Sequence, residues 1–346
     1  MLAAVLHGAH DLRVEHRDDR GLAAGEARVR VAAGGICGSD LSYFNKGGVG
    51  DFKVREPLIL GHEVSGTVVE LAPDASGPPV GTRVAVNPSR PCLRCRYCRA
   101  GRGNLCSAMR FLGSAAPMPH VQGGFSECLV VRADQCVPVP DTLSFRLAAC
   151  AEPLAVALHA VARAGSLVGR QVLIAGAGPI GLLCLAAARH AGAAGVAIVD
   201  LCEPPLEIAR RMGASDARDV SGDPETLDRL AAAHGGFDVA IEATGAASSV
   251  ARMPHLVRPG GRIVQLGMLP PGEVPLPVNL LMAREIDLLG SFRFHDSFDI
   301  AVSALAGGRI DITPILSASF ALQDANAAFV MAGDRQHAIK VHLEIG

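Results

Sequence analysis

The chain has 346 residues, of which 49% are hydrophobic and 19% are charged, and its formal net charge at pH 7 is −2. A chain of this length usually forms two domains, and this composition excludes intrinsic disorder. The nearly balanced charge gives no electrostatic reason to expect nucleic acid as a partner. The longest apolar stretch, around residues 181–188, is broken by Arg189 and His190. It is shorter than the roughly 20 residues that span a bilayer, so we expect no membrane segment.

The start of the chain and its cysteines indicate the compartment. Residues 1–7 have neither the basic start nor the long apolar region of a signal peptide, which predicts a cytoplasmic protein. Cysteines stay reduced in the cytoplasm, so the ten cysteines of this chain favour metal binding over disulfides.

Strands and turns dominate the first 150 residues. Short runs rich in β-branched residues are separated by glycine and proline, and they lie at 27–31, 64–71, 82–86 and 128–132. After residue 290 the pattern indicates two helices, 298–306 and 324–332, and a last strand, 338–345. We expect both stretches to form one β-rich domain, of residues 1–153 and 291–346.

A different pattern fills the region between these stretches. An alanine-rich helical segment, 154–164, comes first. Apolar strands then alternate with helices, the strands at 172–175, 196–199, 237–241 and 262–266 and the helices at 180–190, 206–212, 226–234 and 248–257. This alternation is typical of a buried parallel sheet. The sequence therefore predicts an α/β protein, in which a doubly wound domain of residues 154–290 is inserted into the β-rich domain.

Four cysteines follow one another closely in the β-rich part. Cys92, Cys95, Cys98 and Cys106 have the spacing C-x2-C-x2-C-x7-C, which lets a short loop wrap around a tetrahedral zinc ion. Arginines between them help to keep the thiols deprotonated. The alternatives are unpaired loop thiols or a redox pair. Because four thiolates leave no open coordination position, we expect this zinc to be structural.

Three shorter motifs suggest a second, catalytic zinc site. Cys37 lies between glycines, His62 and Glu63 follow Gly61, and Glu152 stands just before Pro153. Taken singly, such residues are usually core cysteines or surface pairs. Taken together, they supply the few mixed ligands with which a catalytic zinc keeps one position open.

A dinucleotide-binding turn follows the first strand of the predicted parallel sheet. Gly176, Gly178 and Gly181 form the pattern G-x-G-x-x-G, with Pro179 and Ile180 opening the next helix. The glycines allow a tight turn, a close approach of the pyrophosphate and close helix packing, and the helix N-terminus attracts the phosphates.

Asp200 ends the next strand, 19 residues beyond Gly181, where an acid that binds the ribose is expected. Its carboxylate would accept hydrogen bonds from both ribose hydroxyls and would repel a 2′-phosphate. Leu201 and Cys202 supply no arginine for such a phosphate, so the sequence favours NAD over NADP. The alternative is an ordinary aspartate at a strand end.

Several of these motifs also carry a resemblance. The stretch GHEVSGTVVELAPDA, together with GGICGSDL, LILGHE, NPSRPC, MRFLGSA, PHVQGGF, AEPLAVALHA and GSFRF, resembles the zinc-containing alcohol dehydrogenases of the medium-chain dehydrogenase/reductase superfamily. Within it, the L-idonate 5-dehydrogenases and then the sorbitol dehydrogenases are most similar. The resemblance runs from end to end. It implies a GroES-like fold for the β-rich catalytic domain and a Rossmann fold for the NAD-binding domain.

The resemblance also implies roles for the second metal site. The residues that match Cys37 and His62 bind the catalytic zinc, which acts on the substrate hydroxyl as a Lewis acid. Glu63 is a ligand or a close neighbour, and Glu152 binds the metal directly or through water. Ser39 takes the alcohol proton. Polyol dehydrogenases usually carry histidine where this chain has Ser42. Since serine is no base near pH 7, we expect water to continue the proton path.

The implied reaction transfers a hydride from a secondary alcohol of a sugar acid or polyol to NAD, with L-idonate oxidised to 5-keto-D-gluconate. Tyr43, Arg293 and Glu152 match positions that contact substrate hydroxyls. Arg110 and His120 lie in a segment shared with the L-idonate enzymes and are candidates for binding a carboxylate.

Several alternatives to this assignment stay open at this point. Sorbitol, threonine or another secondary alcohol is the alternative substrate, and a non-enzymatic protein that binds NAD and zinc is the alternative from a different class. Relatives form dimers or tetramers, so we expect a homodimer or a homotetramer.

Overall fold

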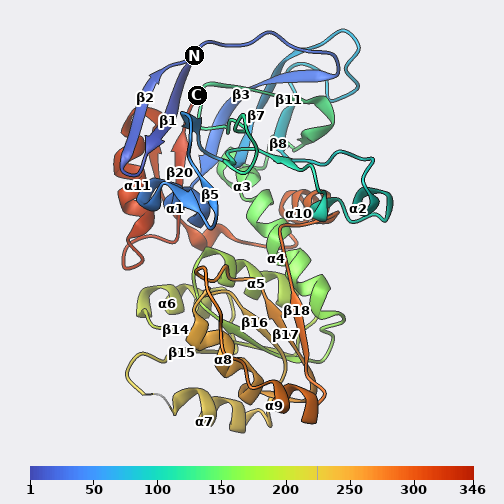
Figure 1. Cartoon of the computed structure of the whole chain (residues 1–346), viewed down its shortest axis with the longest axis vertical. Helices are drawn as coiled ribbons and strands as arrows, with labels where there is room; N and C mark the ends of the chain where they lie inside the picture. The colour runs from blue at the N-terminus through green and yellow to red at the C-terminus, as the bar shows by residue number, and fades with distance from the viewer. Residues whose placement is uncertain (224) are drawn as a thin grey trace.

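The computed structural model describes every residue of the chain except residue 224. Two large sheets organise the chain, one in the upper and one in the lower part of Figure 1. The upper sheet has the order β12-β8-β7-β3-β20-β19, and β11 pairs with β3. Its strands are β3 (Glu26–Gly35), β7 (Glu63–Leu71), β8 (Arg83–Val86), β11 (Cys128–Arg132), β12 (Cys136–Pro138), β19 (Leu316–Ala321) and β20 (Lys340–Glu344). It thus combines the start of the chain with its last strand.

The lower sheet is parallel throughout and has the order β15-β14-β13-β16-β17-β18. Its strands are β13 (Gln171–Ala175), β14 (Gly195–Asp200), β15 (Asp216–Asp219), β16 (Phe237–Glu242), β17 (Val257–Gln265) and β18 (Asp287–Gly290). The order reverses at β13, next to β16. In such doubly wound sheets, ligands bind outside the carboxyl ends of the strands at this reversal.

Helices and short strands complete both parts. The helices of the lower part are α4 (Ala151–Ala164), α5 (Pro179–His190), α6 (Glu203–Arg211), α7 (Thr226–Ala233), α8 (Ala247–Leu256) and α9 (Val278–Ala283). The other helices are α1 (Gly38–Lys46), α2 (Arg96–Arg99), α3 (Phe145–Ala149), α10 (Ser297–Ala306) and α11 (Ala325–Gly333). The shorter strands are β1 (Leu2–Gly8), β2 (Asp11–His16), β4 (Gly48–Val49), β5 (Phe52–Lys53), β6 (Leu58–Ile59), β9 (Ser89–Arg90) and β10 (Arg110–Phe111).

Helix α4 joins the two parts. It packs against α5 of the lower part and against α10. One apolar core extends from Ala85 of β8, past Leu154 of α4, to Ile174 of β13. The sequence predicted that this helix begins at residue 154, but it begins at Ala151. Glu152 therefore lies in its first turn. Pro153 is compatible with this start, because a proline in the first turn breaks no hydrogen bond within the helix.

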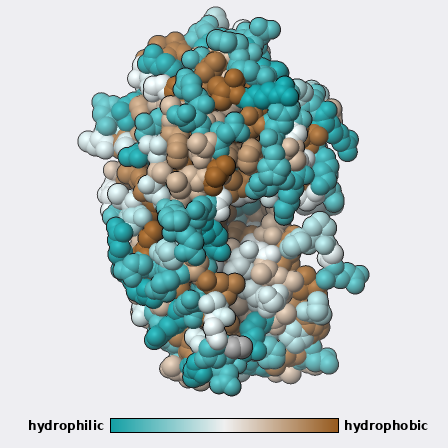
Figure 2. Space-filling model, turned by 90° about the vertical axis from the view of Figure 1, so that its left-hand side faces the viewer, coloured by the Kyte–Doolittle hydropathy of each residue, from teal (hydrophilic) through white to brown (hydrophobic). Residues whose placement is uncertain are grey.

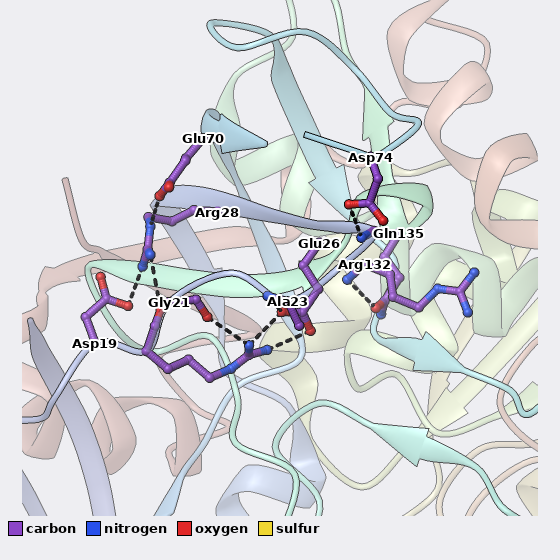
Figure 3. A network of polar contacts seen from close by, with 11 residues as sticks. Asp19, Gly21, Ala23, Glu26, Arg28, Glu70, Asp74, Arg132 and Gln135 are labelled. Carbon is purple, nitrogen blue, oxygen red and sulfur yellow. Dashed lines mark hydrogen bonds and ion pairs between the residues drawn. The ribbon is translucent and has the colours of Figure 1, made fainter. Parts of the chain in front are cut away.

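A surface network of ion pairs fastens the segment before β3 to the upper sheet (Figure 3). Arg28 of β3 binds Glu70 of β7, with 2.8 Å between Nε and Oε2, and also pairs with Asp19. The backbone N–H of Gly25 donates to Asp74 at 3.1 Å. These pairs join a half-buried arginine to exposed carboxylates and contribute little stability individually. They connect the segment before β3, the strand that leads to Cys37, to the neighbouring strand.

The predicted strands at 27–31, 64–71, 82–86, 128–132, 172–175, 196–199, 237–241 and 262–266 correspond to β3, β7, β8, β11, β13, β14, β16 and β17. Within the described part of the chain, no helix has the length and apolarity needed to cross a membrane. The domain boundaries near residues 153 and 291 stay a prediction.

Candidate active site

The side chains of Cys37, His62 and Glu63 meet at one end of the upper sheet. Cys37 lies between β3 and α1, and Glu63 is the first residue of β7. The two strands are antiparallel, and Gly35 lies directly opposite Glu63. A Cβ atom at Gly35 would overlap the Glu63 carboxylate, so this approach requires glycine. The Cys37 thiol, a ring nitrogen of His62 and a Glu63 oxygen all lie within 4.8 Å of one another.

Asp40 supports this cluster from behind. Its carboxylate is fully buried and accepts the backbone N–H of Cys37 at 3.0 Å and that of Gly61 at 3.3 Å. Asp40 Oδ1 lies 3.7 Å from His62 Nδ1. Burial alone would lower the pKa of His62, but the charges of Asp40 and Cys37 raise it well above its usual value. The cluster therefore attracts positive charge.

A buried lysine holds the Glu63 carboxylate. Lys340 of β20 lies with its Nζ atom 2.8 Å from both Glu63 oxygens and donates to the Ile36 carbonyl at 3.1 Å. Burial lowers the pKa of the Lys340 ammonium, but the charges of Glu63 and Cys37 outweigh this and raise it. Sequence reasoning assigned no role to Lys340 or Asp40. Lys340 lies in none of the quoted motifs, and Asp40 lies in GGICGSDL, where Cys37 and Ser39 drew the assignments.

The Glu152 carboxylate is the remaining acid of the predicted site. It is buried, but it lies outside the group of ligand atoms that are within 4.8 Å of one another. Burial raises the pKa of Glu152 to about 7, and the charge of Glu63 acts in the same direction. A nearby dication would oppose this rise. A thiol, an imidazole and carboxylates in such surroundings fit a catalytic zinc ion.

Three further predicted residues surround this cluster. Ser39 lies in the first turn of α1, two residues after Cys37, and is half-buried. The Tyr43 side chain is buried, and its hydroxyl accepts the N–H of Ala115 at 3.0 Å. The Arg293 guanidinium lies 4.4 Å above the Phe111 ring.

The Phe111 ring connects Arg293 to the metal cluster, because it also packs 5.5 Å from the His62 ring. Arg293 has a backbone φ of 53°, a strained conformation for a residue other than glycine. Such strain tends to occur at functional sites.

The structure separates Arg110 and His120 from this cluster. Neighbouring residues of a strand point to opposite faces, so Arg110 points away from the side on which Phe111 contacts His62. Arg110 lines another cavity, of about 340 Å³, together with His120.

Both ring nitrogens of His120 are engaged with the backbone, one at 3.0 Å from the Arg55 nitrogen and one at 2.9 Å from the Pro117 oxygen. These contacts argue against His120 as a substrate ligand at the metal cluster, and the direction of the Arg110 side chain argues against Arg110. We therefore leave both residues out of the proposed site.

The four clustered cysteines form a second candidate metal site. The thiols of Cys92, Cys95, Cys98 and Cys106 lie within 4.8 Å of one another. Backbone N–H groups of Cys98 and Ser107 lower the pKa of Cys95 to about 5. Burial and the neighbouring thiols raise the pKa of Cys98 to about 12. Backbone N–H groups of Arg94 and Cys95 also lower the pKa of Cys92. Thiolates are thus favoured at Cys92 and Cys95, whereas a negative charge at Cys98 is resisted in the absence of a cation. This donor set fits a structural zinc ion.

The lobe that carries these cysteines also contacts the substrate side of the molecule. Asn104 donates from Nδ2 to the Phe292 carbonyl at 3.0 Å, next to Arg293. We therefore expect Cys95→Ala to lower the unfolding temperature and to remove one zinc ion per chain, with activity lost as a consequence. Calorimetry and elemental analysis measure both effects. Cys184→Ala, in the buried part of α5, is the control that keeps both zinc ions. An unchanged metal content in Cys95→Ala would contradict this assignment.

The glycine turn lies between β13 and α5, where the lower sheet reverses its order. Gly176 has a φ of 99°, and a Cβ atom at Gly181 would overlap the Gly176 carbonyl. Around a Cβ atom at Gly178, in contrast, no atom of the described residues lies within 4 Å. Gly176 and Gly181 are thus required by the turn itself, whereas Gly178 leaves open space above the N-terminus of α5. This space fits a pyrophosphate.

Asp200 lies next to this turn, as the sequence predicts. Its Oδ2 atom accepts the backbone N–H of Ala177 at 2.6 Å, and its side chain is only 3% exposed. The turn and the predicted ribose-binding acid are therefore in direct contact.

Comparisons with known proteins agree with this geometry. The family model described as "Alcohol dehydrogenase GroES-like domain" matches residues 23–141, and the one described as "Zinc-binding dehydrogenase" matches residues 179–307. The chain is 43% identical over 317 residues to L-idonate 5-dehydrogenase (NAD(P)(+)) of Escherichia coli (strain K12), covering 91% of this chain and 90% of that protein. The chain belongs to the zinc-containing alcohol dehydrogenase family.

Two further similarities support this membership. Sorbitol dehydrogenase of Bacillus subtilis (strain 168) is 34% identical over 334 residues, which cover 96% of this chain and 93% of that protein. The crystal structure of L-idonate 5-dehydrogenase from Escherichia coli K-12 superposes with a TM-score of 0.94 and 40% identity, covering 99% of this chain and 97% of that one.

The predicted family and the α/β fold with GroES-like and Rossmann parts are confirmed. The prediction of an enzyme rather than a non-enzymatic binding protein is confirmed as well. The protein is a zinc-dependent oxidoreductase of the alcohol and polyol class. Its cofactors are zinc and a nicotinamide adenine dinucleotide. The roles of the single residues stay predictions.

Proposed function

We propose that the enzyme oxidises a secondary hydroxyl of a sugar acid, and that L-idonate, oxidised to 5-keto-D-gluconate, is its substrate. The observation that carries this proposal is the Arg293 guanidinium, which lies between the Phe111 and Phe292 rings at 4.4 and 4.9 Å from their centroids. A sugar acid differs from a polyol by a terminal carboxylate. Arginine binds carboxylates well, because its planar fork matches their two oxygens.

The surroundings of Arg293 favour a ligand with a negative charge. Burial lowers the pKa of Arg293, and the charges of Glu152 and Tyr43 raise it only in part. No hydrogen-bonded carboxylate contributes among the residues that the structure describes. A half-buried cation without such a partner gains more from a substrate carboxylate than from a hydroxyl.

In this proposal, Cys37 and His62 hold the catalytic zinc ion, and the Glu63 and Glu152 carboxylates complete its surroundings. When bound, zinc would supply Lewis acidity at the reacting hydroxyl, and the dinucleotide would supply the hydride acceptor. Lys340 pairs with the Glu63 carboxylate and orients it. Asp40 orients the His62 ring.

The proposal gives the remaining residues binding and proton-transfer roles. Ser39 takes the proton of the hydroxyl and passes it toward solvent through water. Arg293 and Tyr43 orient the far end of the substrate. The Gly176–Gly181 turn, with Pro179 and Ile180, holds the pyrophosphate, and Asp200 holds the ribose.

A panel of L-idonate, other aldonates, sorbitol and threonine tests the substrate proposal. The formation of NADH, followed by its absorbance, gives kcat/KM for each compound. We expect the highest value for L-idonate. A higher value for sorbitol would favour the polyol alternative, which is supported by the similarity to a sorbitol dehydrogenase.

Arg293→Ala tests how the substrate is recognised. We expect a loss of about 1.5–3 kcal/mol in transition-state stabilisation with L-idonate, the range for a hydrogen bond to a charged group. The loss with sorbitol should be much smaller, because sorbitol has no carboxylate. Arg110→Ala is the matched control, since Arg110 faces the other cavity and should leave both values unchanged. Equal losses on both substrates in Arg293→Ala would contradict carboxylate recognition.

We further infer a cytoplasmic homodimer or homotetramer. Strand β18 lies at the edge of the lower sheet, with Leu288 exposed, and Val278 and Met282 of the neighbouring α9 are exposed as well. Apolar side chains beside an unpaired sheet edge favour pairing with a second chain. Light scattering after size exclusion measures the assembly.

All ten cysteines are free thiols, which suits a reducing compartment such as the cytoplasm.

A further inference from the structure

The Asp200 carboxylate pairs with Arg335, an arginine that is far from it in the sequence. Arg335 donates from Nη2 to Asp200 Oδ2 at 2.6 Å. The sequence favoured NAD because Leu201 and Cys202, the two residues directly after Asp200, are not cations. The structure supplies that cation from a segment 135 residues further along the chain.

A fixed turn presents Arg335 to Asp200. The turn connects α11 with β20, and Asp334 organises it by accepting the N–H of Gln336 at 3.0 Å and a ring nitrogen of His337 at 2.8 Å. The Arg335 carbonyl also accepts the Cys202 thiol at 3.6 Å.

These contacts join the upper and lower parts of the molecule. Helix α11 and β20 belong to the upper part of Figure 1, and β14, which ends at Asp200, belongs to the lower part. Figure 2 shows this side of the molecule, with a recess between the two parts.

The hydrogen-bonding capacity of Asp200 is nearly used up. A carboxylate offers about four acceptor positions. The N–H of Ala177 and Arg335 occupy Oδ2, and the N–H of Leu201 occupies one position on Oδ1 at 2.7 Å. One position is left, whereas the two hydroxyls of an adenosine ribose require two.

Arg335, in contrast, has capacity to spare. A guanidinium carries five N–H donors, and within the described part of the chain one of those of Arg335 donates, to Asp200. Its side chain is 54% exposed, while that of Asp200 is 3% exposed. A bound ribose would therefore lie beside a carboxylate whose charge is paired and beside an exposed guanidinium. Such surroundings would attract a 2′-phosphate rather than repel it.

We propose that Arg335 is a cofactor-specificity residue, which lets the adenosine-ribose pocket bind a 2′-phosphate, so that the enzyme uses NADP as well as NAD. Arg335 neutralises Asp200 and donates to the phosphate with its remaining N–H groups. Hydrogen bonds between a guanidinium and a phosphate are charge-assisted and bidentate. With NAD, the 2′-hydroxyl takes the one open position on Asp200.

Binding of nucleotide fragments to the zinc-loaded enzyme tests this proposal without any substrate. Isothermal titration calorimetry gives Kd for adenosine 2′,5′-bisphosphate and for AMP, which differ only in the 2′-phosphate. For Arg335→Ala, we expect Kd of the bisphosphate to rise by about tenfold or more, as for a lost charge-assisted bond. Kd of AMP should not rise. Arg335→Lys keeps the charge and should lose less.

Arg13→Ala is the matched control, because Arg13 is equally exposed and pairs with Asp11 at 2.7 Å on β2. It should leave both Kd values unchanged. The ratio of kcat/KM for NADP to that for NAD should fall in Arg335→Ala, for whichever alcohol the enzyme oxidises. An equal loss of both fragments would overturn the proposal, since Arg335 would then only hold Asp200 in place. Unchanged binding of the bisphosphate would overturn it too.

Discussion

Cys37→Ala is expected to abolish turnover while the protein stays folded. The thiol is one of the clustered groups that fit the catalytic zinc. Lewis acidity contributes several kcal/mol to stabilising the transition state, and each 1.36 kcal/mol changes the rate tenfold. We therefore expect kcat/KM to fall by about 10³-fold or more. Elemental analysis should show the loss of one zinc ion per chain, and thermal unfolding should stay cooperative, because the cysteine lobe is untouched.

Cys128→Ser is the control for this variant, since Cys128 is half-buried in β11 and belongs to neither metal cluster. It should keep both zinc ions and near-normal turnover. His62→Ala should behave as Cys37→Ala does. Near-normal turnover in Cys37→Ala, or a full zinc content, would rule out the assignment of the catalytic site.

Lys340→Met is expected to have the largest effect on stability. Lys340 and Glu63 form a fully buried pair, with 2.8 Å between Nζ and both carboxylate oxygens. Removing one partner of such a pair leaves an uncompensated buried charge, which typically costs about 3–5 kcal/mol. Urea unfolding of the zinc-loaded enzyme gives this change in the free energy of unfolding.

The double variant Lys340→Met with Glu63→Gln removes the uncompensated charge, and it should be less destabilised than Lys340→Met alone. Arg218→Met is the surface control, because Arg218 pairs with Asp216 on the exposed β15. It should change stability by less than about 1 kcal/mol. If Lys340→Met costs no more than this control, Lys340 does not stabilise the buried carboxylate.

The sequence predicted those parts of the site that have local signals. The four cysteines lie within 15 residues of one another and the glycine turn within six, so short spacings identify both. The strand that leads to Cys37, β3, and the strand that begins at Glu63, β7, have clear β-branched patterns. The short polar strand β15 has no such pattern and was missed.

Long-range contacts escaped the sequence for a physical reason. Lys340 reaches Glu63 across 277 residues, and Arg335 reaches Asp200 across 135. Such pairs form only when the chain is folded, so the spacing of residues along the sequence does not reveal them. For Arg110 and His120, a local signal was misleading. Both lie in segments that resemble those of the L-idonate enzymes, but strand alternation turns Arg110 away from the metal cluster and backbone hydrogen bonds engage the His120 ring.

The pairing of β20 with β3 also bears on how the chain folds. The strands of the lower sheet come from one continuous stretch, 171–290, and each pairs within it. The upper sheet must bring His342 opposite Gly35, with that stretch between them. The entropy of closing so large a loop makes such pairing slow. The cysteine lobe needs only neighbouring residues, whereas the Glu63–Lys340 pair needs β20 in place. We therefore expect the lobe to be able to bind its metal ion before β20 pairs with β3, and the second metal cluster to be completed only after that pairing.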